Sequence, residues 1–556
     1  MTEKMPVYDS KLPLESNDLK GGAAEALGLD TPGGEQERKL LELFSASEMS
    51  LSDEREMEAR IRSVLREYLQ EECISSNEDF ESLQSRFEHS EMPEGTLNLG
   101  RYVDYIAEAI IPHSIRTSSR RFVGHMTSAL PSFVRPLQIL IAALNQNLVK
   151  VETSKVFTAY ERQAIAMMHR LVFSQPSEFY QLHTQQAQST LGMIVSGGTL
   201  ANLTALWCAR NQSLRPTDGA CGIEEQGLAA TLSSQGYQEA VIIGSGLLHY
   251  SFQKVAGILG IGTRNLKMLP VDRRGRIELS ALREAIAECR ENKKCIIALV
   301  GVAGSTDCGS IDPLSQMAEI ASGEGIHFHV DAAWGGPLLF SETNRRKLSG
   351  IEAADSVTID GHKQLYLPMG VGLLLLRDPY LAQSIEKSAA YIIRAGSADL
   401  GRYSVEGSRP DRVTLLQAAL NVIGRKGYAL LIDEGIRKTN YLAARIRARA
   451  EFELLCEPEM NILVYRYLPA QYRERVGGGE IGPSDTEFVN RFNTALQKAQ
   501  LDSGYSFVSR TTLNNTSYGC PVAALRCVIA NPLTRESDLD AILEHQIEIA
   551  AGLQVA

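Results

Sequence analysis

The sequence lacks a long apolar run. The longest ones, such as 371–376, are far too short to span a bilayer, which takes about 20 apolar residues. The first twenty residues also lack the apolar stretch of a secretion signal. We therefore expect a cytoplasmic chain that does not insert into a membrane.

Paired cysteines and an excess of positive charge are also missing. The nine cysteines are scattered over 556 residues and none forms a Cys-x-x-Cys pair, which favours the reduced thiols of a cytoplasmic protein. The net charge of −11 argues against broad nucleic-acid binding, which needs a basic stripe. It leaves an acidic small substrate open, because the local charge in a cleft decides that.

The composition that remains is that of an ordinary globular enzyme, with 44% hydrophobic and 22% charged residues, and the length allows two or three domains. We see no internal repeats. We predict a loose polar leader over 1–36, a helical segment over 37–115, a large domain over 116–425 and a small α+β domain over 426–556. Residues 54–72 carry apolar side chains at helical spacing, and this helix either wraps a partner subunit or caps its own domain.

Short apolar strands alternate with helices through the middle of the chain. Strands are predicted at 191–195, 240–243, 266–270, 295–303, 327–330, 356–359 and 371–376, and helices at 200–210, 251–259, 278–290 and 313–321. This alternation predicts an α/β domain with a mostly parallel seven-stranded sheet and helices on both faces. Ligands of such domains bind at the carboxyl ends of the strands.

The C-terminal part mixes the two element types differently. Strands are predicted at 452–455, 461–467 and 525–529, and helices at 486–499 and 536–550. This order predicts the small α+β domain.

The most informative residues are Asp331 and Lys363. Asp331 ends one apolar stretch, and Lys363 stands in Asp-Gly-His-Lys after the β-branched run 356–359. A carboxylate and a lysine at neighbouring strand ends are what an enzyme needs to hold pyridoxal phosphate: the lysine binds the cofactor covalently and the carboxylate keeps its ring nitrogen protonated. Small residues after Asp331 suit a flat ring lying over Ala333. The pair predicts chemistry at the alpha carbon of an amino acid.

Three further segments fit this cofactor. The turn 196–199, with Gly198 and Thr199, lies between a strand and a helix, where backbone amides can bind a phosphate. His249 follows an apolar strand, and a flat aromatic side chain there can stack on a pyridine ring. Thr306 follows the strand 295–303 and can bring a hydroxyl to the cofactor. Each signal is weak alone, and their order over about 170 residues gives them weight.

A metal site is the alternative interpretation of one motif. His327, His329 and Asp331 alternate along one predicted strand, so their side chains share a face, as in some zinc sites. A zinc hydrolase would need a further ligand, and Ala332 and Ala333 follow instead. We therefore predict no metal.

With these motifs the chain resembles the group II pyridoxal-phosphate decarboxylases over about residues 100–550. The most specific segments are HVDAAWGG (329–336), DSVTIDGHK (355–363) and VSGGTLANLTALW (195–207). Segments 120–131, 143–162, 405–410 and 526–534 are similar to a bacterial branch that decarboxylates aspartate and is itself similar to glutamate decarboxylase.

The resemblance implies a fold type I homodimer with active sites at the subunit interface. By motif match, Lys363 binds the cofactor, Asp331 pairs with the pyridine nitrogen, His249 stacks on the ring and Thr306 approaches it. Around the phosphate the match assigns Gly198, Thr199 and His362. A tyrosine on a loop after the lysine delivers a proton in relatives; Tyr391 stands in that place, and Tyr403 is the alternative.

The substrate side is matched less specifically. Segment 120–131 corresponds to a substrate-side strand of the family, so His125, Thr127 and Ser128 are candidates for binding the side-chain carboxylate of the substrate. Arg409 is another candidate, or a purely structural residue. The chain also departs from the pattern: many relatives have Asn-Pro where it has Asp360-Gly361, and Asp411 replaces a common glycine. An acid beside a phosphate is repulsive unless it points away or takes a donor.

The resemblance implies alpha-decarboxylation of a small acidic L-amino acid, with L-aspartate to β-alanine favoured. L-Glutamate to γ-aminobutyrate and cysteine sulfinate to hypotaurine are the alternatives, and a catalytically inactive scaffold is a remote one. One methylene separates aspartate from glutamate, which is worth only about 1–3 kcal/mol of discrimination. No residue pattern decides between them.

Overall fold

The computed structural model describes residues 44, 48–92, 99–216, 221–389 and 396–554. Contacts between residues divide the chain into two compact units, residues 1–71 with 80–114 and residues 72–79 with 115–556. The helix predicted over 54–72 belongs to the first unit, where it is α3 and is joined to α5 by the Arg60–Asp104 ion pair. The elements of this unit are α3 (Glu48–Gln70), α4 (Phe80–Ser85), α5 (Leu99–Tyr105), the π-helical turn η1 (Ile106–Ile110) and η2 (Ile111–His113).

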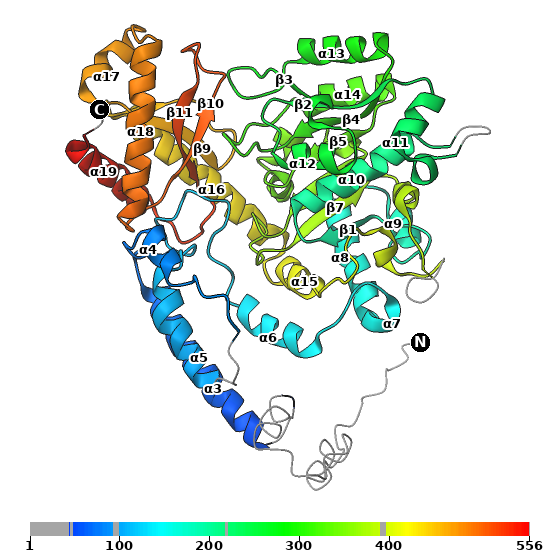
Figure 1. The fold of residues 1–556 in the computed structure, drawn as a ribbon, viewed down its shortest axis with the longest axis horizontal. Helices are drawn as coiled ribbons and strands as arrows, with labels where there is room; N and C mark the ends of the chain where they lie inside the picture. The colour runs from blue at the N-terminus through cyan, green and yellow to red at the C-terminus, as the bar shows by residue number, and fades with distance from the viewer. Residues whose placement is uncertain (1–43, 45–47, 93–98, 217–220, 390–395, 555–556) are drawn as a thin grey trace. The chain divides into compact units, whose positions relative to one another are not determined.

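The second unit contains two sheets, of which the larger has seven strands (Figure 1). Its strands are β1 (Gly192–Val195), β2 (Glu239–Ser245), β3 (Leu266–Leu269), β4 (Lys294–Val302), β5 (Phe328–Asp331), β6 (Ser356–Asp360) and β7 (Gly372–Leu376). They lie in the order β1-β7-β6-β5-β4-β2-β3, and β7 pairs antiparallel with both of its neighbours while the other pairs are parallel. The predicted mostly parallel sheet of seven strands is confirmed.

Helices cover this sheet and continue into the C-terminal region. They are α6 (Val134–Leu144), α7 (Val151–Ser154), α8 (Val156–Phe173), α9 (Ser177–His183), α10 (Gly198–Ser213), α11 (Ile223–Ser234), α12 (Ser251–Ile258), α13 (Leu279–Glu291), α14 (Leu314–Glu324), α15 (Val413–Val422), α16 (Gly424–Arg447), α17 (Ala470–Gly477), α18 (Pro483–Asp502) and α19 (Glu536–Gly552). Short 3-10 turns are η3 (Thr263–Asn265), η4 (Gly336–Phe340), η5 (Arg345–Leu348), η6 (Ile351–Ala353), η7 (Leu381–Ile385) and η8 (Leu400–Tyr403). In the described part of the chain, no helix has the length and apolarity to cross a bilayer.

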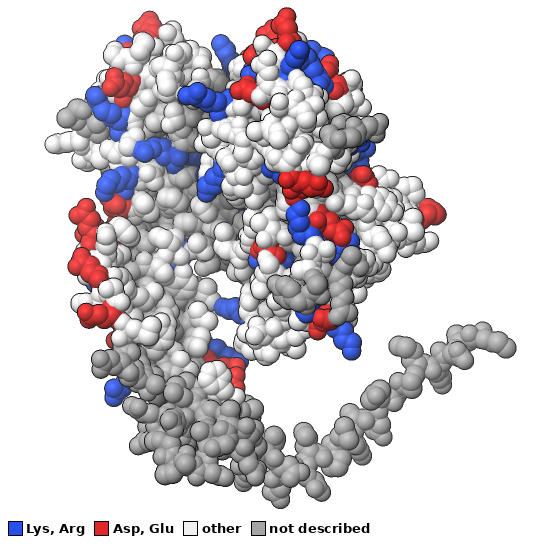
Figure 2. Space-filling model, turned by 45° about the vertical axis from the view of Figure 1, so that its right-hand side comes forward, with Lys and Arg blue, Asp and Glu red and all other residues white. Residues whose placement is uncertain are grey.

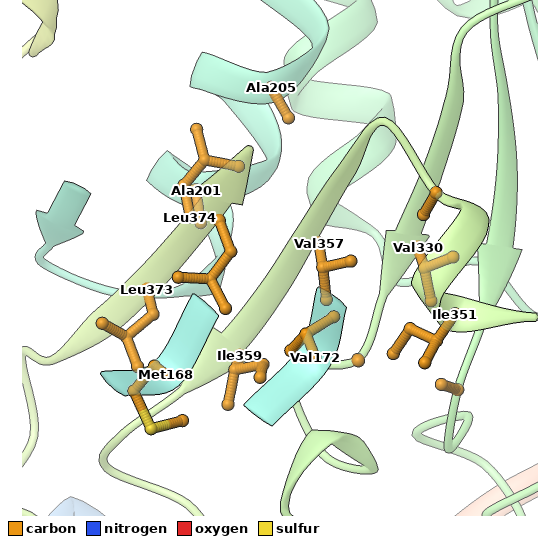
Figure 3. Close-up of a cluster of buried hydrophobic side chains, with 14 of the residues drawn as sticks. Met168, Val172, Ala201, Ala205, Val330, Ile351, Val357, Ile359, Leu373 and Leu374 are labelled. Atoms are coloured by element: carbon orange, nitrogen blue, oxygen red, sulfur yellow. The ribbon is translucent and has the colours of Figure 1, made fainter. Parts of the chain in front are cut away.

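The strands are nearly all buried because helices cover both faces of the sheet. Successive side chains of a strand point to opposite faces. On β7, Leu373 lies beside Met168 of α8, whereas Leu374 lies toward Ala201 of α10 (Figure 3). A strand that packs on both sides needs apolar residues at nearly every position, which explains the run Gly-Leu-Leu-Leu-Leu of β7.

The smaller sheet is fully antiparallel, in the order β10-β11-β9-β8, and helices α16 and α18 pack against it. Its strands are β8 (Phe452–Leu454), β9 (Ile462–Tyr467), β10 (Ser509–Leu513) and β11 (Val522–Val528). The sequence predicted three of them and missed β10. This edge strand reads Ser-Arg-Thr-Thr-Leu and is partly exposed, so it lacks the apolar signal of a core strand. Helix α16 begins at Gly424, close to the predicted boundary between the large and the small domain near 425. This domain boundary stays a prediction.

Two glycines allow the close approach that brings the glycine turn to the end of β6. A Cβ on Gly372, at the start of β7, would lie 2.5 Å from the backbone carbon of Gly197, so this contact has no room for a side chain. Gly197 itself has φ of 149°, in the region that favours glycine. Because Gly372 pairs with Asp360, the turn after β1 lies directly beside the residues that follow β6.

A buried ion pair joins several segments of the large domain near that turn. Arg409 and Glu161 of α8 are 2% and 1% exposed and form a salt bridge. The Arg409 guanidinium also donates to the carbonyl oxygens of Leu148, at 2.9 Å, and of Ile194 in β1, at 3.0 Å. One side chain therefore joins a helix, a strand and two loops.

We expect Arg409→Met to destabilise the protein strongly, because it leaves the Glu161 carboxylate buried without its cation. Such a loss costs roughly 3–5 kcal/mol. The exposed pair Arg425–Glu342 provides the matched control, since Arg425→Met should cost less than about 1 kcal/mol. Thermal and denaturant unfolding measure both variants, and equal effects would show that the buried pair is not a special constraint.

Candidate active site

The carboxyl ends of five parallel strands meet at one edge of the large sheet. The glycine turn follows β1, His249 follows β2, Thr306 follows β4, Asp331 ends β5 and Lys363 follows β6. The pKa of His249 is influenced by the charges of Asp331, Lys363 and Asp360, so these side chains share one site. The structure thus brings His249, Asp331 and Lys363 together, whereas Thr306 is placed only by its position after β4.

The Asp331 carboxylate is buried, 8% exposed, and held at both oxygens. Its Oδ1 accepts the backbone N–H of Ala333 at 3.1 Å, and its Oδ2 accepts the side-chain N–H of Asn202 at 3.0 Å. The carboxylate is therefore fixed at the strand end, with lone pairs left over for a further donor.

Lys363 lies one turn beyond the end of β6 and is paired with Asp360. Its Nζ is 3.1 Å from Asp360 Oδ2, and the Lys363 side chain is 17% exposed. The next residue, Gln364, donates to the carbonyl oxygen of Trp334 at 2.7 Å and accepts from Asn461 of the smaller domain. These contacts fix the lysine turn against both the Asp331 turn and the C-terminal domain.

His249 has a defined protonation pattern. Its Nδ1 accepts the N–H of Ser251 at 3.2 Å, so the ring proton is on Nε2. Partial burial lowers the pKa of His249, and the charge of Lys363 lowers it further, against the opposing effect of Asp331. A neutral, half-buried imidazole lies beside the carboxylate and the lysine.

The glycine turn offers free backbone donors at the start of α10. Among the described residues, the N–H groups of Gly198 and Thr199 have no acceptor, and Gly197 caps the helix without a side-chain bond. A Cβ on Gly198 would lie 2.8 Å from Asp360 Oδ2, so a larger residue there would displace the Asp360 carboxylate. His362, which donates from Nδ1 to the Val371 carbonyl at 2.8 Å, lies on the other side of the turn. The N-terminus of a helix with such free N–H groups suits a phosphate.

These groups fit pyridoxal phosphate. A lysine can hold its aldehyde, a fixed carboxylate can face its ring nitrogen, and free helix N–H groups can bind its phosphate. Asp360 is the one residue that fits less well, because its Oδ1 is buried without a hydrogen-bond partner close to the proposed phosphate site. Its other oxygen is offset by Lys363 and lies 3.7 Å from His362 Nε2.

The substrate-side candidates lie in an irregular segment, because residues 120–131 form a single bridge at Phe122 instead of the expected strand. His125 is exposed and 3.1 Å from the Thr127 hydroxyl, while Ser128 is buried. Although the residue is exposed overall, partial desolvation of its ring lowers the pKa of His125, and so do the positive charges of Arg526, Lys363 and His362. His125 is therefore close to the lysine end of the site.

The contacts of Arg409 are those of a framework residue. Its terminal nitrogens are taken up by Glu161 and two carbonyl oxygens, which leaves them unavailable to a substrate carboxylate. Of the two tyrosine candidates, Tyr391 lies outside the described residues. Tyr403 is 1% exposed, and its charged neighbours are Arg402, Glu386 and Arg162 instead of the site residues.

The alternating histidines that suggested a metal site are bound within the protein. His329 uses both ring nitrogens, at 2.9 Å from Ser356 Oγ and 3.0 Å from Asn202 Oδ1. His327 Nε2 lies 2.8 Å from the same serine oxygen. Within the part of the chain that the structure describes, no group of three His, Cys, Asp or Glu side chains could hold a metal ion.

Sequence reasoning missed two residues at this site. Asn202 lies near the start of α10 and was assigned no role, although its side chain contacts Asp331. Arg526 lies on β11 of the smaller domain, 324 positions from Asn202, and its buried guanidinium influences His125. The sequence signal that could have found them is one polar residue, Asn202 or Arg526, within an otherwise apolar segment.

Charge on the described surface is mixed. On the face shown in Figure 2, Lys and Arg side chains are interspersed with Asp and Glu side chains. This face has no continuous basic stripe of the kind that nucleic-acid binding needs.

Comparisons with known proteins find similar decarboxylases. The chain is 42% identical to the aspartate 1-decarboxylase of Aliivibrio fischeri over 520 residues, which cover 93% of this chain and 95% of that protein. It is 27% identical to mouse cysteine sulfinic acid decarboxylase, over 96% of this chain and 98% of the relative.

Solved structures share the fold. The crystal structure of mouse CSAD matches with a TM-score of 0.77 at 24% identity, over 89% of this chain and 99% of that one. Oryza sativa TDC with PLP and tryptamine matches with a TM-score of 0.78 at 18% identity, over 91% and 99%. Residues 89–468 match the pyridoxal-dependent decarboxylase conserved domain, so this chain belongs to the pyridoxal-dependent decarboxylase family.

Proposed function

We propose that this enzyme removes the alpha-carboxylate of L-aspartate and releases β-alanine and carbon dioxide. The observation that carries the choice of substrate is the 42% identity to an aspartate 1-decarboxylase over nearly the whole of both chains. The intact pair of Asp331 and Lys363 supports an active enzyme over an inactive scaffold.

Bound pyridoxal phosphate supplies the electron sink that takes up the electron pair left by the departing carboxylate. In our proposal Lys363 binds the cofactor aldehyde, and Asp331 accepts a hydrogen bond from its ring nitrogen. The imidazole of His249 would stack on the ring, and Ala333 and Thr306 would also contact the cofactor. The N–H groups of Gly198 and Thr199, together with His362, bind the phosphate.

Substrate recognition needs positive or donor groups near Lys363. We propose that His125, Thr127 and Ser128 contact the side-chain carboxylate of aspartate, with the buried guanidinium of Arg526 as the neighbouring positive charge. The charge coupling of His125 to both Arg526 and Lys363 supports this placement. We further propose that Tyr391 returns a proton to the alpha carbon, since Tyr403 is buried elsewhere.

A product assay tests the substrate. Purified, cofactor-loaded enzyme is given aspartate, glutamate and cysteine sulfinate separately, and the amines are quantified. We expect kcat/KM for aspartate to exceed that for glutamate by roughly 10- to 200-fold, the range that one methylene provides. A preference for γ-aminobutyrate or hypotaurine as product would replace aspartate by glutamate or cysteine sulfinate.

Lys363→Ala should abolish covalent cofactor binding, because no other amine takes the place at the end of β6. We expect the visible absorbance of the lysine-bound cofactor to disappear and borohydride to fix no cofactor to the chain. Lys254→Ala is the matched control, since this lysine on α12 lies near His249 but not at a strand end. Cofactor fixed to another lysine in Lys363→Ala, located by peptide mass spectrometry, would contradict the assignment.

We also propose that the enzyme is a homodimer. Helix α6 exposes Ile139, Leu140 and Leu144, each more than two-fifths accessible, and Val422 on the contacting helix α15 is 67% exposed. Such an apolar face on a monomer marks an interaction surface. A second copy of the chain is the occupant that the family resemblance implies.

Leu140→Glu should weaken this dimer by roughly 100-fold or more, because it would bury an unpaired charge in the interface. Light scattering after size exclusion should give twice the chain mass of 61.0 kDa for the native enzyme and one chain mass for the variant. Ile258→Glu, at a still more exposed apolar residue of α12, is the control and should remain dimeric. A native monomer, or an unaffected Leu140→Glu dimer, would rule out this interface.

A further inference from the structure

A row of buried polar side chains lies between α10 and the large sheet. It consists of His327, His329, Asp331, Ser356 and Asn202, and we call it the polar seam. His329 and Asp331 alternate on β5 and Ser356 of β6 pairs with His329, so these three side chains point to one face of the sheet, and His327 lies just before β5. The apolar residues between them, such as Val330 and Val357, lie in the layer that contains Met168 and Val172 of α8 (Figure 3).

The polar seam is one continuous chain of hydrogen bonds. His327 Nε2 lies 2.8 Å from Ser356 Oγ, which lies 2.9 Å from His329 Nδ1. His329 Nε2 lies 3.0 Å from Asn202 Oδ1, and Asn202 Nδ2 lies 3.0 Å from Asp331 Oδ2. Its last acceptor is the carboxylate that faces the cofactor ring in the proposed function.

The chemistry of the groups fixes the direction of every donor. A carboxylate only accepts, so the Asn202 amide must donate from Nδ2, and its Oδ1 must accept from His329. The same Nδ2 also donates to Ser251 Oγ at 3.3 Å. The His329 proton is therefore on Nε2, and Nδ1 is left to accept the hydroxyl proton of Ser356.

Burial keeps the histidines of the seam neutral. Desolvation lowers the pKa of His329 to about 3, against the opposing effect of Asp331, and also lowers the pKa of His327. A neutral His329 has one N–H, and this N–H is committed to Asn202. His327 then donates from Nε2 to the serine oxygen, so all four hydrogen bonds point toward Asp331.

We propose that Asn202 and His329 are positioning residues that orient the Asp331 carboxylate and hold it as the hydrogen-bond acceptor that keeps the cofactor ring nitrogen protonated. This inference rests on the proposed function for the presence of the ring. The neutral state of the polar seam favours the protonated ring. It supplies a donor to the carboxylate without adding a second positive charge that would compete with the protonated ring.

The seam also explains the choice of residue types. Asn202 must donate and accept through one planar amide, which neither a leucine nor a carboxylate does at neutral pH. His329 must donate at one ring nitrogen and accept at the other. A merely structural role would be satisfied by apolar residues of similar volume.

The sharpest test is Asn202→Asp, because it keeps the shape and changes only the donor. The new carboxyl group must carry a proton to donate to Asp331, and the two acids share a site, so that proton is held to unusually high pH. We expect cofactor affinity close to the native value at acidic pH. It should fall by about tenfold or more as the pH rises and the group ionises.

The direct readout is the ¹⁵N chemical shift of [¹⁵N]pyridoxal phosphate bound to the enzyme, which reports whether the ring nitrogen is protonated. We expect the native shift to be that of a protonated nitrogen, and the shifts of Asn202→Ala and His329→Leu to move toward the unprotonated value. His329→Gln, which keeps an N–H near the position of Nε2, should restore most of the native shift. Cofactor affinity, measured by titration without substrate, should follow the same order.

Two controls keep the outcomes separate. Thr204→Val alters another buried residue of α10, whose hydroxyl bonds only to the Leu200 carbonyl at 2.8 Å, and should behave as the native enzyme. Asp331→Asn should lose ring protonation altogether.

Native shifts and affinities in Asn202→Asp and His329→Leu at high pH would overturn the inference, whichever amino acid proves to be the substrate. A native protonated ring with no β-alanine formed would instead count against the proposed function alone.

Discussion

The buried Asp331 carboxylate is the constraint on which the rest of the site depends. A carboxylate taken out of water is costly unless donors replace its hydration. Here the donors are the backbone N–H of Ala333 and the amide of Asn202, and the second requires α10 to cross the sheet above β5. The glycine turn that starts α10 is thereby placed beside Lys363. The hydrogen bonds of one buried carboxylate therefore relate three parts of the site: Asp331, the glycine turn and Lys363.

The strand pattern of the large domain could be predicted because burial on both faces demands apolar residues at nearly every position. This holds for β7 and for β4 after its first residue, Lys294, since the rest of both strands is apolar. The prediction fails for β10, a partly exposed edge strand whose polar residues are typical of a loop. The segment 120–131 shows the converse case: it matches a family strand, yet its backbone hydrogen bonds form only an isolated bridge at Phe122 and no continuous strand.

The chemistry of the site was predictable where the residue type itself is unusual at its position, as with an acid and a lysine at neighbouring strand ends. Contacts between distant segments were not. Nothing in the sequence near Asn202 indicates that it reaches Asp331, and nothing near Arg409 indicates that Glu161 is its partner. The alternating histidines were recognised as sharing a face, yet their acceptors come from β6 and α10.

The alternation along β5 and β6 also has a consequence for folding. If β5 shifted by one residue, His329 and Asp331 would point into the apolar layer beside α8, and Val330 would replace them in the seam. Each misplaced polar group would cost several kcal/mol without its partners. Helices therefore cannot cover strands that are paired out of register. The residues that build the catalytic centre also select the correct strand register when the sheet assembles.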